Sequence, residues 1–180
     1  KPAEREERHR RAGQSRYLDP LALDTPPLAL GNAAREAIRL ADTVQDMLTG
    51  LLTVLRTNDT QLAESLRRRD DEIDRLYSAI KRYLAQISRE ALDTGESRRW
   101  TEVIQFTINM EHIGDIVEQI IDDLEQKKIS KGRSFSEAGM KEIEELHARL
   151  MASLRLGMNV FLNGDLRSAQ RQVGAREAVD

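Results

Sequence analysis

Cysteine is absent from this sequence, and all four prolines lie at or before Pro27. Without cysteine there is no disulfide, no thiolate metal site and no cysteine nucleophile, and the sequence fits a reducing compartment such as the cytoplasm. Because proline interrupts helices more strongly than any other residue, nothing after Pro27 forces a helix to break. Aromatic residues make up only 4% of the chain, and it has no run of about 18 apolar residues that could cross a membrane.

Charged residues are abundant, at 33%, but they are unevenly distributed. Residues 1–16 contain six Lys or Arg and three Glu, lack hydrophobic periodicity and are predicted to be a disordered basic linker. Because the net charge of the chain is −3, the remaining residues carry −6. An acidic helical body argues against a nucleic-acid partner. The chain starts at Lys1 and stops at Asp180 within a helical pattern, so we expect it to be part of a longer protein.

Hydrophobic residues after position 31 recur at steps of three and four, which is the spacing of helices in a bundle. Three helices are predicted, at about residues 32–56, 60–92 and 97–127, and together they would form a first three-helix bundle at residues 32–128. The preceding residues 17–31 contain three of the four prolines and are predicted to be an extended lead-in, which then enters a helix with Thr25 as N-cap and a proline in the first turn.

A repeat indicates that a second bundle follows the first. Asn58-Asp59, at a predicted turn, matches Gly164-Asp165 after a shift of 106 positions, and apolar positions coincide at the same shift. A turn is therefore expected at residues 163–165, within an incomplete second bundle at residues 134–180. The predicted fold is all-α, with tandem antiparallel three-helix bundles of which the second is truncated in this chain.

Acidic residues gather on two of the predicted helices. On the third helix four acids follow one another at steps of four, three and four, and at roughly 100° per residue they fall within an arc of about 60°. On the second helix Asp70 occupies a position where the pattern requires an apolar residue, and Asp74 follows one turn later. A short loop makes the two helices antiparallel neighbours, with these acids at a similar height. The candidate ligands are Asp70, Asp74, Glu111, Asp115, Glu118 and Asp122.

Spacing alone leaves two interpretations of these acids open. Four like charges on one helix face are tolerated where the face is well solvated, or where cations neutralise it. Asp70 is the residue that a solvated face explains least, because its position in the pattern should be buried. If a cation binds, carboxylate-only ligation suits Mg²⁺, Ca²⁺, Mn²⁺ or ferric iron better than copper or structural zinc.

The sequence does not predict an enzyme, because it contains neither a glycine-rich phosphate loop nor a Ser/His/Asp order. Glu144 and His147 have the Glu-x-x-His spacing of di-iron bundles, but such a site needs two of these pairs. The other copy, Glu6 and His9, lies in the basic linker. His147 is therefore interpreted as a core or boundary residue.

The stretch Glu111-His112-Ile113-Gly114-Asp115 resembles the Glu-Arg-Ile-Gly-Asp signature of PhoU proteins, with His112 in the place of arginine. The resemblance implies tandem three-helix bundles whose Glu/Asp-x-x-x-Asp motifs bind iron or other multivalent cations. It implies metal-ligand roles for Glu111, Asp115, Asp70 and Asp74. Glu118 and Asp122 are an extension of this set by helical geometry. The metal is left open among iron, manganese, zinc, magnesium and calcium.

The lead-in resembles the junction that precedes the PhoU-like domain in membrane proteins of the Na/Pi-cotransporter family. The matching stretches are Tyr17-Leu18-Asp19, Thr25-Pro26, Leu28-Ala29-Leu30 and Ala34-Arg35-Glu36. This resemblance implies a regulatory domain on the cytoplasmic side of the inner (cell) membrane, whose partner is the transmembrane sodium/phosphate transport part of the same polypeptide. The basic linker would then follow the last membrane span, in agreement with positive charge inside.

Two other functions remain open from the sequence. One is a stand-alone PhoU-type regulator of phosphate signalling, and the other is a helical interaction module that binds no metal. The incomplete second bundle would expose apolar side chains, so a homo-oligomer is also expected.

Overall fold

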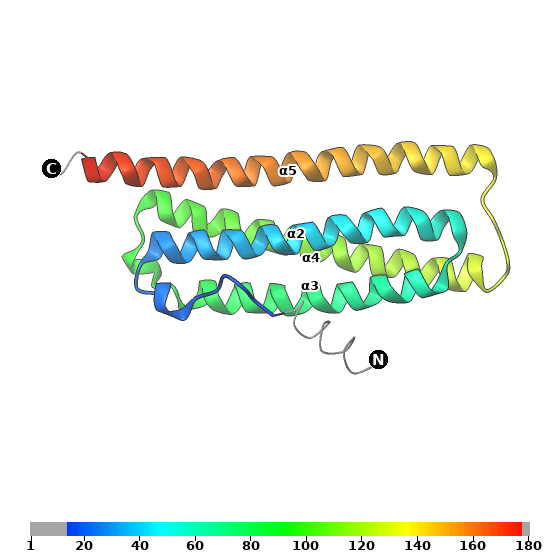
Figure 1. Cartoon of the computed structure of the whole chain (residues 1–180), viewed down its shortest axis with the longest axis horizontal. Coiled ribbons are helices and arrows are strands. Elements are labelled where there is room, and N and C mark those ends of the chain that lie inside the picture. The colour runs from blue at the N-terminus through cyan, green and yellow to red at the C-terminus, as the bar shows by residue number, and fades with distance from the viewer. Residues whose placement is uncertain (1–13, 178–180) are drawn as a thin grey trace.

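The computed structural model describes residues 14–177, with side chains up to residue 164. Within this range the chain forms helices and no strand, which confirms the predicted all-α helical bundle. Four long helices lie side by side along the long axis of the molecule (Figure 1). In chain order the elements are η1 (Pro20–Ala22), α2 (Pro26–Thr57), α3 (Thr60–Gln86), η2 (Arg89–Ala91), α4 (Thr94–Leu124), the π-helix η3 (Glu125–Ile129) and α5 (Glu137–Glu177).

Local signals account for the two turns that join α2, α3 and α4. α2 ends at Asn58, which adopts the left-handed conformation with φ 57°, and the Asp59 side chain then accepts a hydrogen bond from Leu62 N at 2.9 Å. Asp93 and Glu96 form a reciprocal capping box at the start of α4. These caps satisfy backbone N–H groups that a helix N-terminus leaves without partners. The predicted turn at Asn58-Asp59 is confirmed.

Like α4, α2 contacts each of the other three long helices. Its buried face is rich in alanine in the first half and in larger aliphatic side chains in the second. Small side chains allow close approach of the neighbouring helices, and the larger ones fill the core farther along. The fully buried members include Ala33, Ala37, Leu40, Ala41, Val44 and Met47.

α5 lies against α2 and α4 through a few specific contacts. The ring of Phe161 stacks on Phe106 of α4, with centroids 4.0 Å apart. His147 Nε2 lies 2.7 Å from the backbone oxygen of Leu48, as expected for a boundary histidine. Glu144 forms an ion pair with Arg56 of α2. α5 also carries exposed large apolar residues, namely Leu146, Leu150, Leu156, Val160 and Leu162, and the first two of them line an apolar groove between α5, α2 and α4.

The turn expected at residues 163–165 is wrong, because α5 continues through these residues to Glu177. A glycine inside a helix costs only about 1 kcal/mol relative to alanine, so it does not by itself end the helix. Gly164 serves close packing instead. A Cβ on it would lie 2.7 Å from Arg99 Nη1 and 3.3 Å from Glu102 Oε2, both on α4.

The lead-in agrees with the expectation in part. Residues 17–31 are not extended throughout, because Pro20–Ala22 form a 3₁₀ turn, but the predicted entry into a helix is confirmed, since Thr25 is the N-cap of α2 and Pro26 its first residue. Proline is well tolerated in the first turn of a helix, where its missing N–H has no intrahelical partner to lose. The second predicted helix is shorter than expected, since α3 ends at Gln86 and not near residue 92. Residues 1–13 of the predicted basic linker lie outside the described residues.

Candidate metal centre

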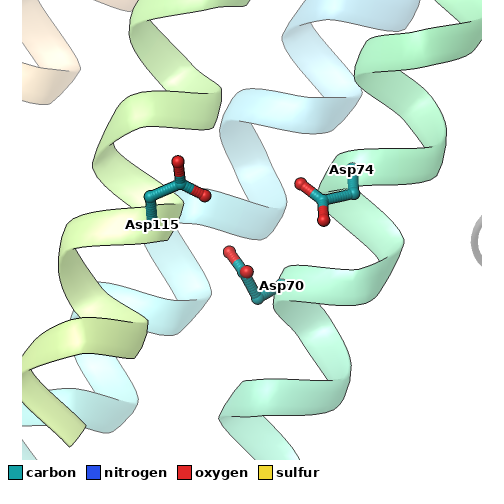
Figure 2. A group of neighbouring side chains, drawn as sticks. All are labelled: Asp70, Asp74 and Asp115. Atoms are coloured by element: carbon teal, nitrogen blue, oxygen red, sulfur yellow. The ribbon is translucent and has the colours of Figure 1, made fainter. Parts of the chain in front are cut away.

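Three of the six predicted acids come together between α3 and α4. Figure 2 shows Asp70 and Asp74 on α3 directed toward Asp115 on α4. One carboxylate oxygen of each lies within 4.8 Å of the other two. Two oxygen ligands of one ion lie no more than about 5 Å apart, since Mg²⁺ and Ca²⁺ bind oxygen at about 2.0–2.6 Å. Asp70 is buried while Asp74 and Asp115 are exposed, so this group, the Asp triad, is open to solvent on one side.

The position of Asp70 depends on a glycine in the facing helix. Its neighbours in the α3 seam, Leu66 and Ile73, are buried in the core. Opposite them α4 carries Gly114, where a Cβ would lie 2.7 Å from Asp70 Oδ1 and 3.2 Å from Ile73 Cδ1. An alanine would therefore compete with the carboxylate for space. Gly114 thus makes the room in which the Asp70 side chain lies between the helices.

Asp70 is the residue of the triad that most needs a positive partner. Its side chain is 4% exposed, and its Oδ1 is buried without a hydrogen-bond partner among the described residues. Burial, followed by the charges of Asp74, Glu118 and Asp115, raises its pKa from 3.8 to about 7. A carboxylate that is both desolvated and surrounded by like charges is unfavourable unless a cation compensates it. The orphaned oxygen and the all-oxygen donor set fit a multivalent cation.

Glu111 and Glu118 flank Asp115 on α4, but neither belongs to the triad. Both are half-buried. Burial, and then the charge of Asp115, raises the pKa of Glu111, and its Oε2 lies 3.7 Å from Nε2 of the exposed His112. Burial, and then the charges of Asp122 and Asp115, raises the pKa of Glu118. As metal ligands the two glutamates stay a prediction.

Asp122, at the end of the acidic face, already has a protein cation. Arg67 of α3 places Nη2 2.5 Å from Asp122 Oδ1 and 2.6 Å from Glu125 Oε2. The guanidinium therefore neutralises this end of the face and connects α3 to α4. Sequence reasoning missed both Arg67 and the role of Gly114. The spacing of Arg67, three residues before Asp70, would have placed it on the same side of α3.

Comparison with known families agrees with this geometry. Residues 37–124 match the family profile described as the PhoU domain. These residues form a PhoU domain. The PhoU domain contains all of α3 and α4, the part of α2 from residue 37 onward, and every one of the six candidate acids. The resemblance of residues 111–115 to the PhoU signature is thereby confirmed at the level of the domain.

Curated relatives extend beyond the PhoU domain. The chain is 44% identical over 156 residues to a protein of Escherichia coli O157:H7 named "Putative inorganic phosphate export protein YjbB". It is 42% identical to the protein of the same name in Salmonella typhimurium. Each alignment covers 87% of this chain but 28% of the relative. No solved structure matches the chain. Among the described helices none has an apolar stretch sufficient to traverse a bilayer.

Proposed function

We propose that this chain is a cytoplasmic regulatory domain of a sodium-dependent phosphate transporter and that it adjusts phosphate movement without being an enzyme. The observation that carries the proposal is the 44% identity, over 87% of the chain, to a protein named for phosphate export. Because the chain corresponds to 28% of that relative, attachment to a larger protein is favoured over a stand-alone regulator. Its partner would be the transmembrane part of the same polypeptide. Sodium coupling and the inner-membrane location rest on the resemblance of the lead-in.

The regulatory role is tested by phosphate flux in cells that lack other phosphate transporters. Full-length protein is compared with a form that ends before residue 37, both expressed to the same level. We expect the shortened form to move phosphate at a rate that no longer responds to the phosphate supply of the cell. Equal rates and equal responses in the two forms would contradict the proposal. Replacing external sodium by potassium tests sodium coupling separately.

We also propose that the Asp triad binds one multivalent cation. The support is the buried, unpartnered Oδ1 of Asp70 beside two further carboxylates within 4.8 Å. A bound cation would balance the charge that now surrounds Asp70 and would hold α3 against α4. It would also offer a positive surface to a phosphate group or to an acidic partner.

Titration calorimetry of the purified chain with Mn²⁺, after treatment with a chelator, tests the triad. We expect saturable binding of one ion, and at least about a tenfold loss of affinity in Asp115→Asn. Asp46→Asn is the matched control, because Asp46 is an exposed acid of α2 whose one ion pair, with Arg69, is long at 3.5 Å. Glu111→Gln and Glu118→Gln report whether these glutamates are ligands. If wild type and Asp115→Asn bind Mn²⁺ equally, the domain is better described as a metal-free interaction module.

A further inference from the structure

The end of the bundle farthest from the lead-in contains a pocket that the metal proposal does not use. It has a volume of about 490 Å³ and lies where α2 ends, where α4 passes into η3, and where the loop to α5 begins. It shares no lining residue with the Asp triad, and the end of α4 at Leu124 lies nine residues beyond Asp115, which corresponds to about 14 Å along the helix. Its walls combine aliphatic side chains and Phe135 with Lys127, Lys128, Arg133 and Ser134.

The unusual end of α4 brings these cations to the pocket. Residues Glu125–Ile129 form a π-helix, in which Ser130 N donates to Glu125 O at 3.0 Å. The chain then reverses at Gly132, with φ 60°, and Arg133 N donates to Lys128 O at 2.9 Å. Single π-turns of this kind are frequent at functional sites. Here the wide turn folds the segment back on itself, so that cations several residues apart in sequence line one pocket.

Lys128 is a buried cation without an acidic partner among the described residues. Its side chain is only 7% exposed. Its Nζ donates to the backbone oxygen of Leu55, at 2.9 Å, and to Asn58 Oδ1, and it lies 4.9 Å from the ring centroid of Phe135. Burial alone lowers its pKa. By donating to these two neutral oxygens the ammonium caps the end of α2, which explains its position but does not balance its charge.

The other cations make the pocket positive as a whole. The guanidinium of Arg133 forms no hydrogen bond or ion pair with the described residues, although it lines the same pocket. Lys127 is paired with Asp123 at 2.9 Å, and this is the one acid in the lining. Lys128 makes the contacts that cap α2, so capping does not explain why the Arg133 side chain lines the pocket. Three cations and a hydroxyl beside an apolar wall match an anion that carries an apolar body.

We propose that this pocket binds a phosphoryl group attached to an apolar body, with Arg133 and Lys128 facing the phosphoryl oxygens and Phe135 facing the apolar body. A phosphoryl dianion presents three oxygen acceptors and would balance the charge that Asp123 leaves uncompensated. Free inorganic phosphate shares the anionic part of this ligand but would leave the apolar wall without a contact. The proposal does not depend on metal at the Asp triad.

Titration calorimetry of the whole chain with phenyl phosphate, inorganic phosphate and phenol tests the pocket. A chelator is present throughout, so that phosphate cannot bind through a metal at the triad. We expect phenyl phosphate to bind with a Kd of about 1 mM or lower, and inorganic phosphate to bind at least about tenfold more weakly. Phenol, which lacks the charge, should give no saturable heat.

Arg133→Gln and Lys131→Gln are compared because they remove the same charge from the same loop. Lys131 is exposed and does not line the pocket. We expect at least about a tenfold loss of affinity for phenyl phosphate in Arg133→Gln, and less than about a twofold change in Lys131→Gln. Phe135→Ala should weaken phenyl phosphate and leave inorganic phosphate unchanged. Lys128 is left intact, since its substitution would also remove the cap of α2.

Three results would overturn the proposal. The first is the absence of saturable phenyl phosphate binding at millimolar concentration. The second is an equal loss in Arg133→Gln and Lys131→Gln, which would mean general charge attraction rather than a pocket. The third is equal affinity for phenyl phosphate and inorganic phosphate, which would mean that the apolar wall takes no part. None of them bears on Mn²⁺ binding at the triad.

Discussion

Asp70 combines burial with three neighbouring acids, and its ionisation should therefore oppose folding when no metal is bound. Its pKa is raised from 3.8 to about 7. An acid with a raised pKa in the folded state causes a loss of stability that begins near the unfolded pKa and is complete above the folded one. In chelator-treated protein, the unfolding free energy of Asp70→Asn should equal that of wild type near pH 3.5. It should exceed the wild-type value by a growing amount as the pH rises to about 7. The gain should reach at least about 1 kcal/mol, given about 1.4 kcal/mol per pKa unit.

Urea unfolding at pH 4, 6 and 8, followed by circular dichroism, measures this gain. The same series with excess Mn²⁺ is the internal control. With Mn²⁺ present, wild type should be more stable than Asp70→Asn, because the ion stabilises only the protein that binds it. An Asn variant that is less stable than wild type at pH 8 without metal would show that Asp70 makes a favourable interaction in the metal-free protein.

Gly114 should matter more for metal binding than for folding. In Gly114→Ala the new Cβ would lie 2.7 Å from Asp70 Oδ1, so the carboxylate must move away from Asp74 and Asp115. Alanine is favoured over glycine in a helix by about 1 kcal/mol, which offsets part of the crowding. We expect at least about a tenfold loss of Mn²⁺ affinity with a change in unfolding free energy of about 1 kcal/mol or less.

Gly31→Ala is the matched control for this substitution. Gly31 lies inside α2, and a Cβ there would meet nothing within 4 Å. The variant should be stabilised by up to about 1 kcal/mol and should bind Mn²⁺ as wild type does. Unchanged metal affinity in Gly114→Ala would mean that Asp70 is not a ligand in its present position.

At the scale of the helices, Arg67 of α3 connects α3 to α4 through ion pairs at the end of the acidic face, away from the Asp triad. It interacts with Asp122 at 2.5 Å and with Glu125 at 2.6 Å while remaining 24% exposed. A partly exposed pair of this kind contributes about 1 kcal/mol. Arg67→Gln should therefore lower the unfolding free energy by about 1 kcal/mol in low salt, and by less in 1 M NaCl, where charges are screened.

Arg68→Gln removes the same charge from the adjacent position. Arg68 is half exposed, and its ion pair, with Glu64 of its own helix, is longer at 3.9 Å. Its loss should change the unfolding free energy by less than about 0.5 kcal/mol. Equal effects of the two variants in urea unfolding would mean that net charge, rather than the contact between α3 and α4, determines the result.

The helices could be predicted because their apolar residues follow a period that the core preserves. The register of α3 against α4 followed from the short loop, and it brought Asp70 and Asp74 to Asp115 as expected. Spacing along α4 could not show that Asp122 stays outside the triad, because Asp122 pairs with Arg67 of the neighbouring helix. The turn at Gly164 was mispredicted for a similar reason. Whether a glycine ends a helix or admits a neighbour depends on what faces it, here Arg99.

At the scale of the whole molecule, α5 forms an open apolar groove with α2 and α4, and further apolar side chains of α5 are exposed beside it. Leu146, Leu150, Leu156 and Val160 are each at least half exposed. Exposed apolar patches of this kind favour association. We therefore expect this chain, when purified on its own, to associate with itself at concentrations of tens of micromolar, which corresponds to about −6 kcal/mol.

Sedimentation velocity over a hundredfold concentration range measures this association. Leu146→Glu/Leu150→Glu should abolish it, because two charges would be desolvated in any interface formed over this groove. Ser78→Glu is the control, since it adds a charge on the exposed side of α3 and should leave association unchanged. A wild-type chain that sediments as a monomer at every concentration would show that this groove does not pair with a second copy. The groove would then be open to another part of a longer polypeptide, which is the partner that the regulatory proposal names.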